Sequence, residues 1–164
     1  LAFLVCAASA NEAYRRSYEI TSLSKPIKAL GLTCPVSCLH EMAKSQDEMT
    51  REWMQVLYGG EPEQSSLWNC SDYADILTDC KELPSIYILT TKGDQKYYRQ
   101  SLALHDLMNR KQIEHVYREW ESMENKDLGH VFNVLYPACQ DSRAANQEMV
   151  YFFLNVRRLY SGTI

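Results

Sequence analysis

Two short apolar runs constrain what this chain can fold into more than any other feature of its sequence. Residues 27–34 and 85–91 are mostly apolar, and the second run is rich in β-branched and aromatic side chains; a proline precedes each run. Runs of this length without strict alternation of polar residues are typical of strands that are covered on both faces. We therefore predict two buried strands.

The segments around these strands carry mainly helical patterns. Residues 113–120 are the exception, because they alternate between apolar and polar side chains as a half-buried edge strand would. Helices that alternate with buried strands predict an α/β fold, with a mostly parallel sheet and helices on both of its faces. We expect residues 1–164 to belong to one domain. The predicted helices are residues 1–17, 38–62, 95–111 and 140–158.

Charge and hydrophobicity argue against two classes of partner. The formal net charge is −4 at pH 7, and no basic patch of the kind that binds nucleic acid stands out. No run of about 18 or more apolar residues occurs, so no membrane-spanning helix is predicted. Residues 1–10 resemble the apolar core of a signal peptide, but they lack an initiator methionine and a basic segment. We therefore expect the sequence to begin inside a longer protein.

An aspartate and a histidine are the best candidates for catalytic residues. Asp94 follows the strand at 85–91, and His130 ends the loop at 121–130, one helix and one strand further along. A carboxylate just past a strand and a histidine on a later loop are two members of a nucleophilic triad. In that role His130 transfers the proton of the nucleophile, and Asp94 orients the imidazole ring.

Each of these assignments has an alternative. His130 can be a loop histidine with ordinary packing. Asp94 directly precedes the helix predicted to start at Gln95 and can instead cap its N-terminus, in which case the two roles compete for one carboxylate. Asp127 is the second choice for the acid, although it lies close to His130 on the same loop, which limits its reach to the outer ring nitrogen.

The other histidines and the cysteines give weaker signals. His40, His105 and His115 lie on predicted helices or on the edge strand, and we interpret them as structural. Cys34, Cys38 and His40 lie close together in the sequence, but structural zinc needs about four ligands and no second pair has a suitable spacing. No sharp glycine-flanked turn presents either thiol as a nucleophile. We predict no metal ion and no cofactor.

These features together resemble the C-terminal half of an α/β-hydrolase. The resemblance is carried by Ser85–Asp94 and the helix after it, by the alternating strand, by Gly129-His130-Val131-Phe132 with Tyr136-Pro137, and by the closing helix. It is closest to the branch of esterases and lipases that includes acetyl esterases and carboxylesterases. In that family the chain order is nucleophile, acid, histidine. The resemblance therefore implies that Asp94 is the acid and His130 the histidine.

The resemblance also implies a helical cap or insertion at residues 38–81, where the family is variable. Large apolar side chains of this segment could line an acyl pocket beneath a cap. A helix that packs its apolar stripe against the body explains them at least as well, so we assign none of them to a site. The residues concerned are Met42, Met49, Trp53, Tyr58 and Trp68.

The nucleophile elbow of the family, Gly-x-Ser-x-Gly, does not occur in the sequence. Leu1-Ala2-Phe3-Leu4 resembles the start of the helix that follows the elbow, so the resemblance implies a serine upstream of Leu1. It further implies a serine hydrolase that acts on small carboxylic esters by acyl transfer, without a cofactor. The missing N-terminal half is then a required partner, and the 164 residues alone are expected to be inactive. A peptidase of the same fold and a non-catalytic binding module are the alternatives.

Overall fold

The computed structural model describes residues 2–17, 19, 21, 25, 27–79, 83–124 and 126–161. The chain forms two compact units, and each is described by itself. The sheet unit comprises Lys25–Pro35 and Leu83–Ile164. The helical unit comprises Leu1–Ser24 and Val36–Glu82. The grouping of residues 1–164 into a single domain stays a prediction.

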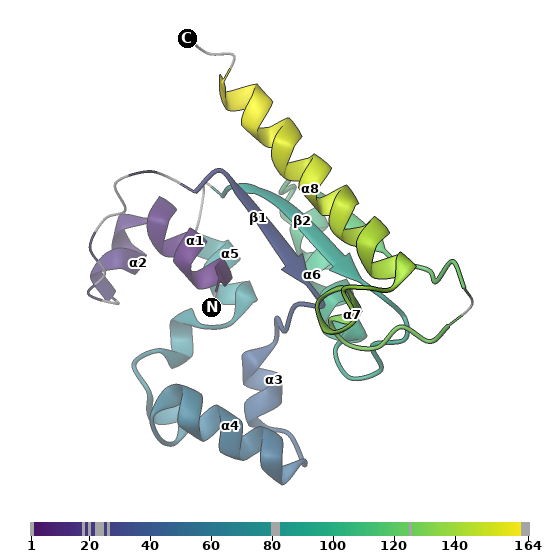
Figure 1. Cartoon of the computed structure of the whole chain (residues 1–164). Coiled ribbons are helices and arrows are strands. Elements are labelled where there is room, and N and C mark those ends of the chain that lie inside the picture. The colour runs from purple at the N-terminus through teal and green to yellow at the C-terminus, as the bar shows by residue number, and fades with distance from the viewer. Residues whose placement is uncertain are drawn as a thin grey trace. The chain divides into compact units, whose positions relative to one another are not determined.

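The described part of the sheet unit contains three parallel strands (Figure 1). They are β1 (Ala29–Thr33), β2 (Ser85–Thr90) and β3 (His115–Glu119), in the order β1-β2-β3. β2 lies in the middle and is almost wholly buried, which agrees with its continuous apolar sequence. Both predicted strands are confirmed, but only β2 is buried on both faces, because β1 alternates between buried and partly buried residues. The alternating segment is an outer strand of the described sheet, as predicted.

Helix α8 (Gln140–Ser161) covers one face of this sheet, in front of it in Figure 1. The hydroxyl group of Tyr87 on β2 donates to Glu148 Oε1 at 3.0 Å, and Arg118 on β3 forms an ion pair with the same oxygen at 3.2 Å. Between sheet and helix lies a hydrophobic core with partly buried side chains of α8 around it. Its buried members are Tyr87, Leu89, Trp120, Leu128, Phe132 and Ala145.

Helix α6 (Tyr98–Arg110) covers the opposite face of the sheet. The ring of His105 on α6 stacks on Tyr117 of β3, with 4.1 Å between ring centroids. The hydroxyl group of Tyr98, at the start of α6, donates to Glu119 Oε2 at 2.6 Å. Tyr117 and Glu119 pair in register with Ile88 and Thr90 of β2, so α6 lies on the face that bears these two side chains. The predicted parallel sheet with helices on both faces is therefore confirmed.

The two long helices of the sheet unit agree with the prediction, except that α6 begins three residues later than expected. α8 and α6 correspond to the segments predicted at 140–158 and 95–111. α6 begins at Tyr98 rather than at Gln95, because a turn precedes it in which Tyr98 N donates to the carbonyl oxygen of Asp94. A short helix that the sequence pattern does not predict, α7 (Phe132–Leu135), follows His130.

The described elements of the helical unit are helices shorter than those predicted. The prediction of one helix over 1–17 is wrong, because one helix ends at Ala10 and a second begins at Glu12. At the break, the Arg15 guanidinium group donates hydrogen bonds to the carbonyl oxygens of Ala8 and Ser9. The prediction of one helix over 38–62 is also wrong, because Asp47 caps a new N-terminus through Thr50 N. The helices are α1 (Ala2–Ala10), α2 (Glu12–Ser17), α3 (Leu39–Ala43), α4 (Glu48–Tyr58) and α5 (Tyr73–Asp79), with two short 3₁₀ helices, Pro62–Gln64 and Trp68–Cys70.

Asp141, in the first turn of α8, fixes the loop that follows β3. Its buried carboxylate accepts hydrogen bonds from Trp120 Nε1 (3.0 Å), Ser122 Oγ (2.9 Å) and Met123 N (2.9 Å). Burial alone would raise the pKa of Asp141, but the hydrogen bonds outweigh it and the pKa lies below its ordinary value. The ionised carboxylate therefore stabilises the folded chain at neutral pH.

We expect Asp141→Asn to lower the free energy of unfolding by about 1–3 kcal/mol at pH 7, because an amide cannot accept all three hydrogen bonds. A depressed pKa gives stability that is present above the unfolded pKa, about 4, and is lost as the pH falls through the folded pKa. The difference between wild type and variant should therefore shrink below about pH 4 in urea denaturation. A difference that does not change with pH would contradict this. Glu121→Gln, at an exposed carboxylate of the same loop, is the control.

Candidate active site

Asp94 lies in a tight turn at the carboxyl end of β2. Asp94 N donates to Thr91 O at 3.1 Å, which closes the turn directly after the strand. The carboxylate is 1% exposed and has a partner for each oxygen: Oδ1 accepts from Tyr97 N at 3.1 Å, and Oδ2 faces His130. The contact that holds the start of α6 and the contact with the histidine therefore use different oxygens. The competition expected from the sequence does not occur.

His130 lies at the same edge of the sheet, on the loop between β3 and α7. Its Nδ1 atom is 2.8 Å from Asp94 Oδ2. Its ring packs against the ring of Tyr97, with 4.7 Å between the centroids. The side chain of His130 is 39% exposed, whereas that of Asp94 is buried. The structure thus brings together the two residues selected from the sequence, with the acid buried and the histidine partly open to solvent.

This hydrogen bond sets the protonation pattern of the imidazole ring. An ionised carboxylate can only accept hydrogen bonds, so the neutral ring carries its proton on Nδ1 and has a lone pair on Nε2. Nε2 of His130 makes no hydrogen bond with any described residue. An oriented imidazole of this kind can accept a proton from a group that approaches Nε2 and can return it later.

The residues after His130 hold its loop in place. Phe132 is wholly buried in the core beneath α8, and its carbonyl oxygen accepts a hydrogen bond from Ser142 Oγ at 3.1 Å. Asn133 Nδ2 donates to Asn146 Oδ1 at 2.8 Å. Val131, with φ of +46°, makes the left-handed turn that allows the chain to enter the core directly after the histidine. The histidine is therefore positioned by the buried and hydrogen-bonded residues that follow it as well as by its own contacts.

Gly93 permits the turn before Asp94 to touch the histidine loop. A Cβ atom at this position would lie 2.2 Å from Asp127 Oδ1 and 2.3 Å from the carbonyl oxygen of Leu128. No side chain fits at such distances, so only glycine allows this approach. The carboxylate of Asp127, the second choice for the acid, lies beside Gly93, and Nδ1 of His130 donates its hydrogen bond to Asp94.

Cys34 is a third side chain at this edge, and sequence reasoning missed its place there. The sequence groups Cys34 with Cys38 and His40, whereas in the described part of the chain its thiol lies beside Asp94 and His130. Cys34 directly follows β1, which pairs in parallel with β2, so the end of each strand reaches the same edge. The position of Cys34 directly after a predicted strand is the sequence feature that could have placed it at this edge. Burial raises the pKa of the Cys34 thiol to about 12, which makes it a poor nucleophile at neutral pH.

The other histidines lie elsewhere and have structural contacts. His115 starts β3, at the amino end of the sheet, and its Nε2 is 2.8 Å from Nδ1 of His105 on α6. In the helical unit, His40 stacks on Trp68 with 3.8 Å between centroids, and its Nε2 lies 2.7 Å from the Trp68 carbonyl oxygen. These contacts agree with the structural interpretation of all three.

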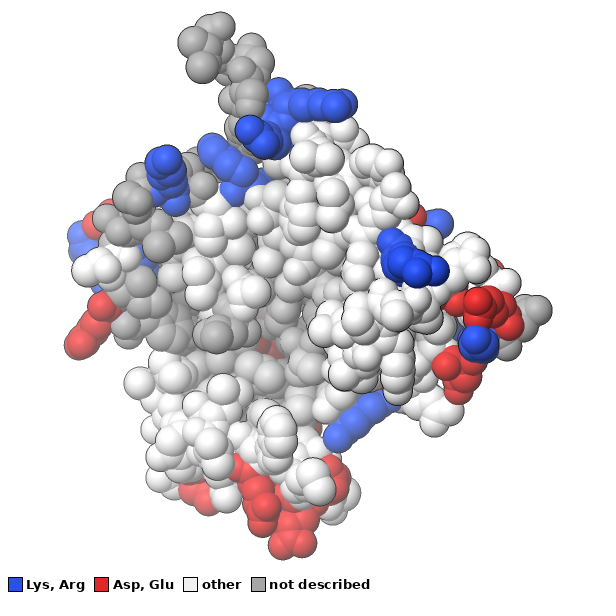
Figure 2. All heavy atoms as spheres, in the orientation of Figure 1, with Lys and Arg blue, Asp and Glu red and all other residues white. Residues whose placement is uncertain are grey.

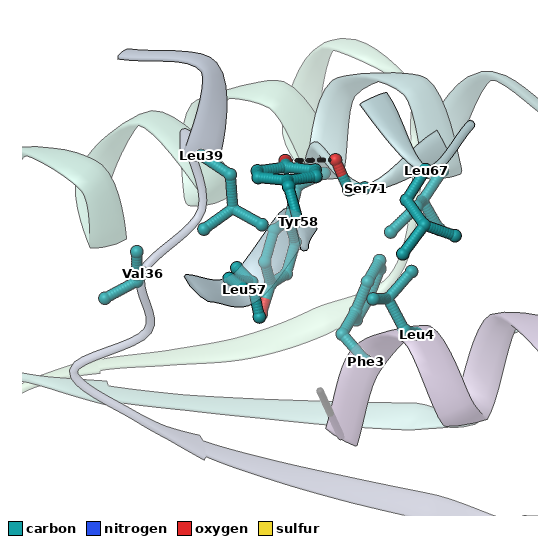
Figure 3. Close-up of a pocket in the computed structure, with 10 residues that line it drawn as sticks. Phe3, Leu4, Val36, Leu39, Leu57, Tyr58, Leu67 and Ser71 are labelled. Carbon is teal, nitrogen blue, oxygen red and sulfur yellow. Dashed lines mark hydrogen bonds between the residues drawn. The ribbon is translucent and has the colours of Figure 1, made fainter. Parts of the chain in front are cut away.

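The helical unit contains an apolar pocket of about 190 Å³ (Figure 3). Of the five large apolar residues singled out from the sequence, Tyr58 is the one that lines it, and its hydroxyl group pairs with Ser71 Oγ. The remaining lining comes from segments far apart in the sequence, which is why local patterns do not reveal it. These residues are Phe3, Leu4, Val36, Leu39, Leu57, Leu67, Tyr73 and Ile76.

One face of α4 is apolar and exposed in the described chain. Trp53 is 70% exposed and Val56 84%, and Met49 and Leu57 are exposed on the same face. Thr50, Met54 and Tyr58 form the buried face instead. Figure 2 shows acidic side chains gathered at the lower edge of that view, over α4. Met49 and Trp53 therefore do not line the pocket, and their side chains are not packed against the rest of the helical unit.

The parallel sheet with helices on both faces is an arrangement found in the α/β-hydrolase fold, and the chain matches about half of a solved chain with that fold. Solved structures show the same fold. The crystal structure of esterase B from Lactobacillus rhamnosis matches with a TM-score of 0.84 and 20% sequence identity, over 97% of this chain and 50% of that chain.

Two inhibited forms of esterase B from the same organism match equally well. The C6-C4 SN3 inhibited form has a TM-score of 0.85 at 20% identity, over 97% of this chain and 50% of that chain. The form inhibited with a C4-C4 SN3 tributyrin phosphonate has a TM-score of 0.84 at 21% identity, over 97% and 49%. The chain thus spans about half the length of these esterase chains, and the likeness establishes the fold.

No protein-family model and no curated protein matches the sequence. Among the helices of the described residues, none is both long and apolar enough to cross a membrane.

Proposed function

We propose that this chain supplies the histidine and the acid of a serine hydrolase that acts on small carboxylic esters. The nucleophilic serine lies upstream of Leu1, in the part of the α/β-hydrolase fold that these residues do not include. The observation that carries the proposal is the 2.8 Å contact between His130 Nδ1 and the buried Asp94 carboxylate at the carboxyl edge of the sheet. In open parallel sheets this edge is where ligands bind.

The proposed reaction is acyl transfer in two halves. The serine hydroxyl group attacks the ester carbonyl carbon while Nε2 of His130 accepts its proton, and the imidazolium then gives that proton to the departing alcohol. Water repeats the sequence on the acyl-enzyme and releases the carboxylic acid. Asp94 keeps the ring in the tautomer with the Nε2 lone pair free, and its negative charge stabilises the imidazolium ion.

The first test is ester hydrolysis by the full-length protein, combined with labelling by a fluorophosphonate, which reacts with activated serines. We expect hydrolysis of p-nitrophenyl acetate or butyrate, and labelling at one serine upstream of Leu1. Hydrolysis of peptide bonds in place of esters would favour a peptidase of the same fold. The absence of both labelling and hydrolysis would contradict the proposal and favour a non-catalytic binding module.

A second prediction separates the two contacts of Asp94. Asp94→Asn retains Oδ1 as the acceptor for Tyr97 N but turns an amide donor toward Nδ1 of His130, which favours the wrong tautomer of the ring. We expect kcat for ester hydrolysis to fall by about 10³–10⁴-fold, with the free energy of unfolding changed by less than about 1.5 kcal/mol.

Asp127→Asn is the matched control, because Asp127 is an exposed carboxylate on the histidine loop. It should lower kcat by less than about threefold, because Asp127 is not the partner of His130. A large loss in Asp127→Asn together with a small loss in Asp94→Asn would reverse the assignment of the acid.

A further inference from the structure

Cys34, Asp94 and His130 form a set of side chains that a metal ion can use. One ligand atom from each, the thiol sulfur, a carboxylate oxygen and a ring nitrogen, lies within 4.8 Å of the other two. Cys34 and Asp94 are buried, and His130 is partly exposed. Proton transfer by the histidine requires Asp94 but gives no reason for a thiol beside the pair, so Cys34 is the unexplained member.

The backbone around the thiol is strained and supplies a donor to the sulfur. Cys34 has φ of +44°, in the left-handed region that non-glycine residues rarely adopt. Its backbone N donates to the Leu89 carbonyl oxygen at 2.7 Å, which fixes this conformation. Val131 N in turn donates to Cys34 Sγ at 3.4 Å.

A second polar group, the hydroxyl group of Thr90, lies beside the thiol. The Thr90 side chain is wholly buried, and its hydroxyl oxygen makes no hydrogen bond within the described residues. It lies beside Cys34, whose pKa is raised overall by burial and by the Asp94 carboxylate. Buried hydroxyl groups normally have a partner, and a negatively charged sulfur would provide one.

We propose that Cys34, Asp94 and His130 bind zinc, and that zinc bound there switches the histidine off. Thiolate, imidazole and carboxylate are the ligand types that zinc prefers, and water completes a four-coordinate site. Ligand atoms around zinc lie roughly 3–4 Å apart, given metal–ligand bonds of about 2.0–2.3 Å. The thiol, which lies within 4.8 Å of the other two ligand atoms, can approach them by up to about 1 Å, whereas His130 Nδ1 and Asp94 Oδ2, now 2.8 Å apart, must separate slightly to admit the ion. His130 can make this movement because its side chain is partly exposed.

The inhibition follows from the chemistry of the ring. Zinc takes the lone pair of Nδ1, so the ring proton moves to Nε2, which then donates and can no longer accept a proton. The Cys34 thiol loses its proton to solvent as the zinc–sulfur bond forms. No electron is transferred, and a chelator reverses the process. The binding is independent of the proposed function, whereas the inhibition rests on it.

Cobalt(II) serves as the spectroscopic probe for this site in the full-length protein. A cobalt–thiolate bond gives an intense near-ultraviolet charge-transfer band, and zinc should displace the cobalt and remove that band. We expect one cobalt per chain, with the band lost in Cys34→Ser and affinity weakened at least about tenfold in His130→Ala. Cys139→Ser, at a more exposed thiol, is the matched control and should retain the band.

Two results would overturn the proposal: no cobalt–thiolate band in the wild type, or a band lost in Cys139→Ser and retained in Cys34→Ser. His130→Ala keeps the test decisive even if Cys34→Ser does not fold. The inhibition is measured as ester hydrolysis with zinc and after chelation. Ester hydrolysis without cobalt binding would contradict the zinc site and support the proposed function. Cobalt binding without ester hydrolysis would support the metal site and contradict the proposed function.

Discussion

Replacing His130 with asparagine is expected to lower kcat for ester hydrolysis by about 10⁵–10⁶-fold in the full-length protein, because it removes the only group proposed to accept the serine proton. Asparagine is chosen because its amide nitrogen can occupy the position of Nδ1 and still donate to Asp94 Oδ2. The buried carboxylate then keeps its partner, so the free energy of unfolding should change by less than about 1 kcal/mol.

Comparison with His130→Ala tests the physical reason for this design. Alanine leaves Asp94 Oδ2 buried without a partner, which should lower the free energy of unfolding by about 1–3 kcal/mol in addition to the loss of activity. Urea denaturation of the two variants measures that difference. Hydrolysis by a folded His130→Asn protein at more than about a hundredth of the wild-type rate would exclude His130 as the general base.

Adding one methyl group at Gly93 is expected to damage both stability and activity. The Cβ atom of Gly93→Ala would lie 2.3 Å from the backbone oxygen of Leu128, and backbone cannot rotate away as a flexible side chain can. Leu128 belongs to the core beneath α8, so the displaced loop disturbs that core as well as the position of His130. We expect the free energy of unfolding to fall by about 2–3 kcal/mol. A shift of about 1 Å at His130 should lower kcat/KM by about 100-fold.

Gly129→Ala is the matched control for Gly93→Ala. Gly129 directly precedes His130 as Gly93 directly precedes Asp94, but a Cβ atom at Gly129 has no neighbour within 4 Å among the described residues. Neither residue is among the glycines with positive φ, so the two substitutions differ in available space and not in backbone strain. Gly129→Ala should change stability by less than about 1 kcal/mol. Equal effects of the two substitutions, measured by urea denaturation, would refute the close contact between the turn and the loop.

Much of the sheet unit follows from local sequence patterns. The buried faces of β2, α6 and α8 need apolar side chains. These side chains recur at short, regular intervals along the sequence, so the pattern of neighbouring residues predicts each element. The helical unit was harder to predict, because its helix breaks depend on single polar contacts. Asp47 caps the N-terminus of α4 by accepting a hydrogen bond from Thr50 N, and Arg15 donates a hydrogen bond to a carbonyl oxygen near the end of α1.

The candidate site likewise has a part that the sequence predicts and a part that only the tertiary structure determines. The sequence by itself identified Asp94 and His130, because a carboxylate after a buried strand and a histidine on a later loop are features of chain order. Only the tertiary structure decided that Asp94 and not Asp127 contacts the ring, and that Cys34 joins the pair. Those choices depend on strand register and on an approach at Gly93 that the added volume of one methyl group would prevent. Contacts between residues distant in the chain leave no periodic pattern in the sequence, so the fold alone determines them.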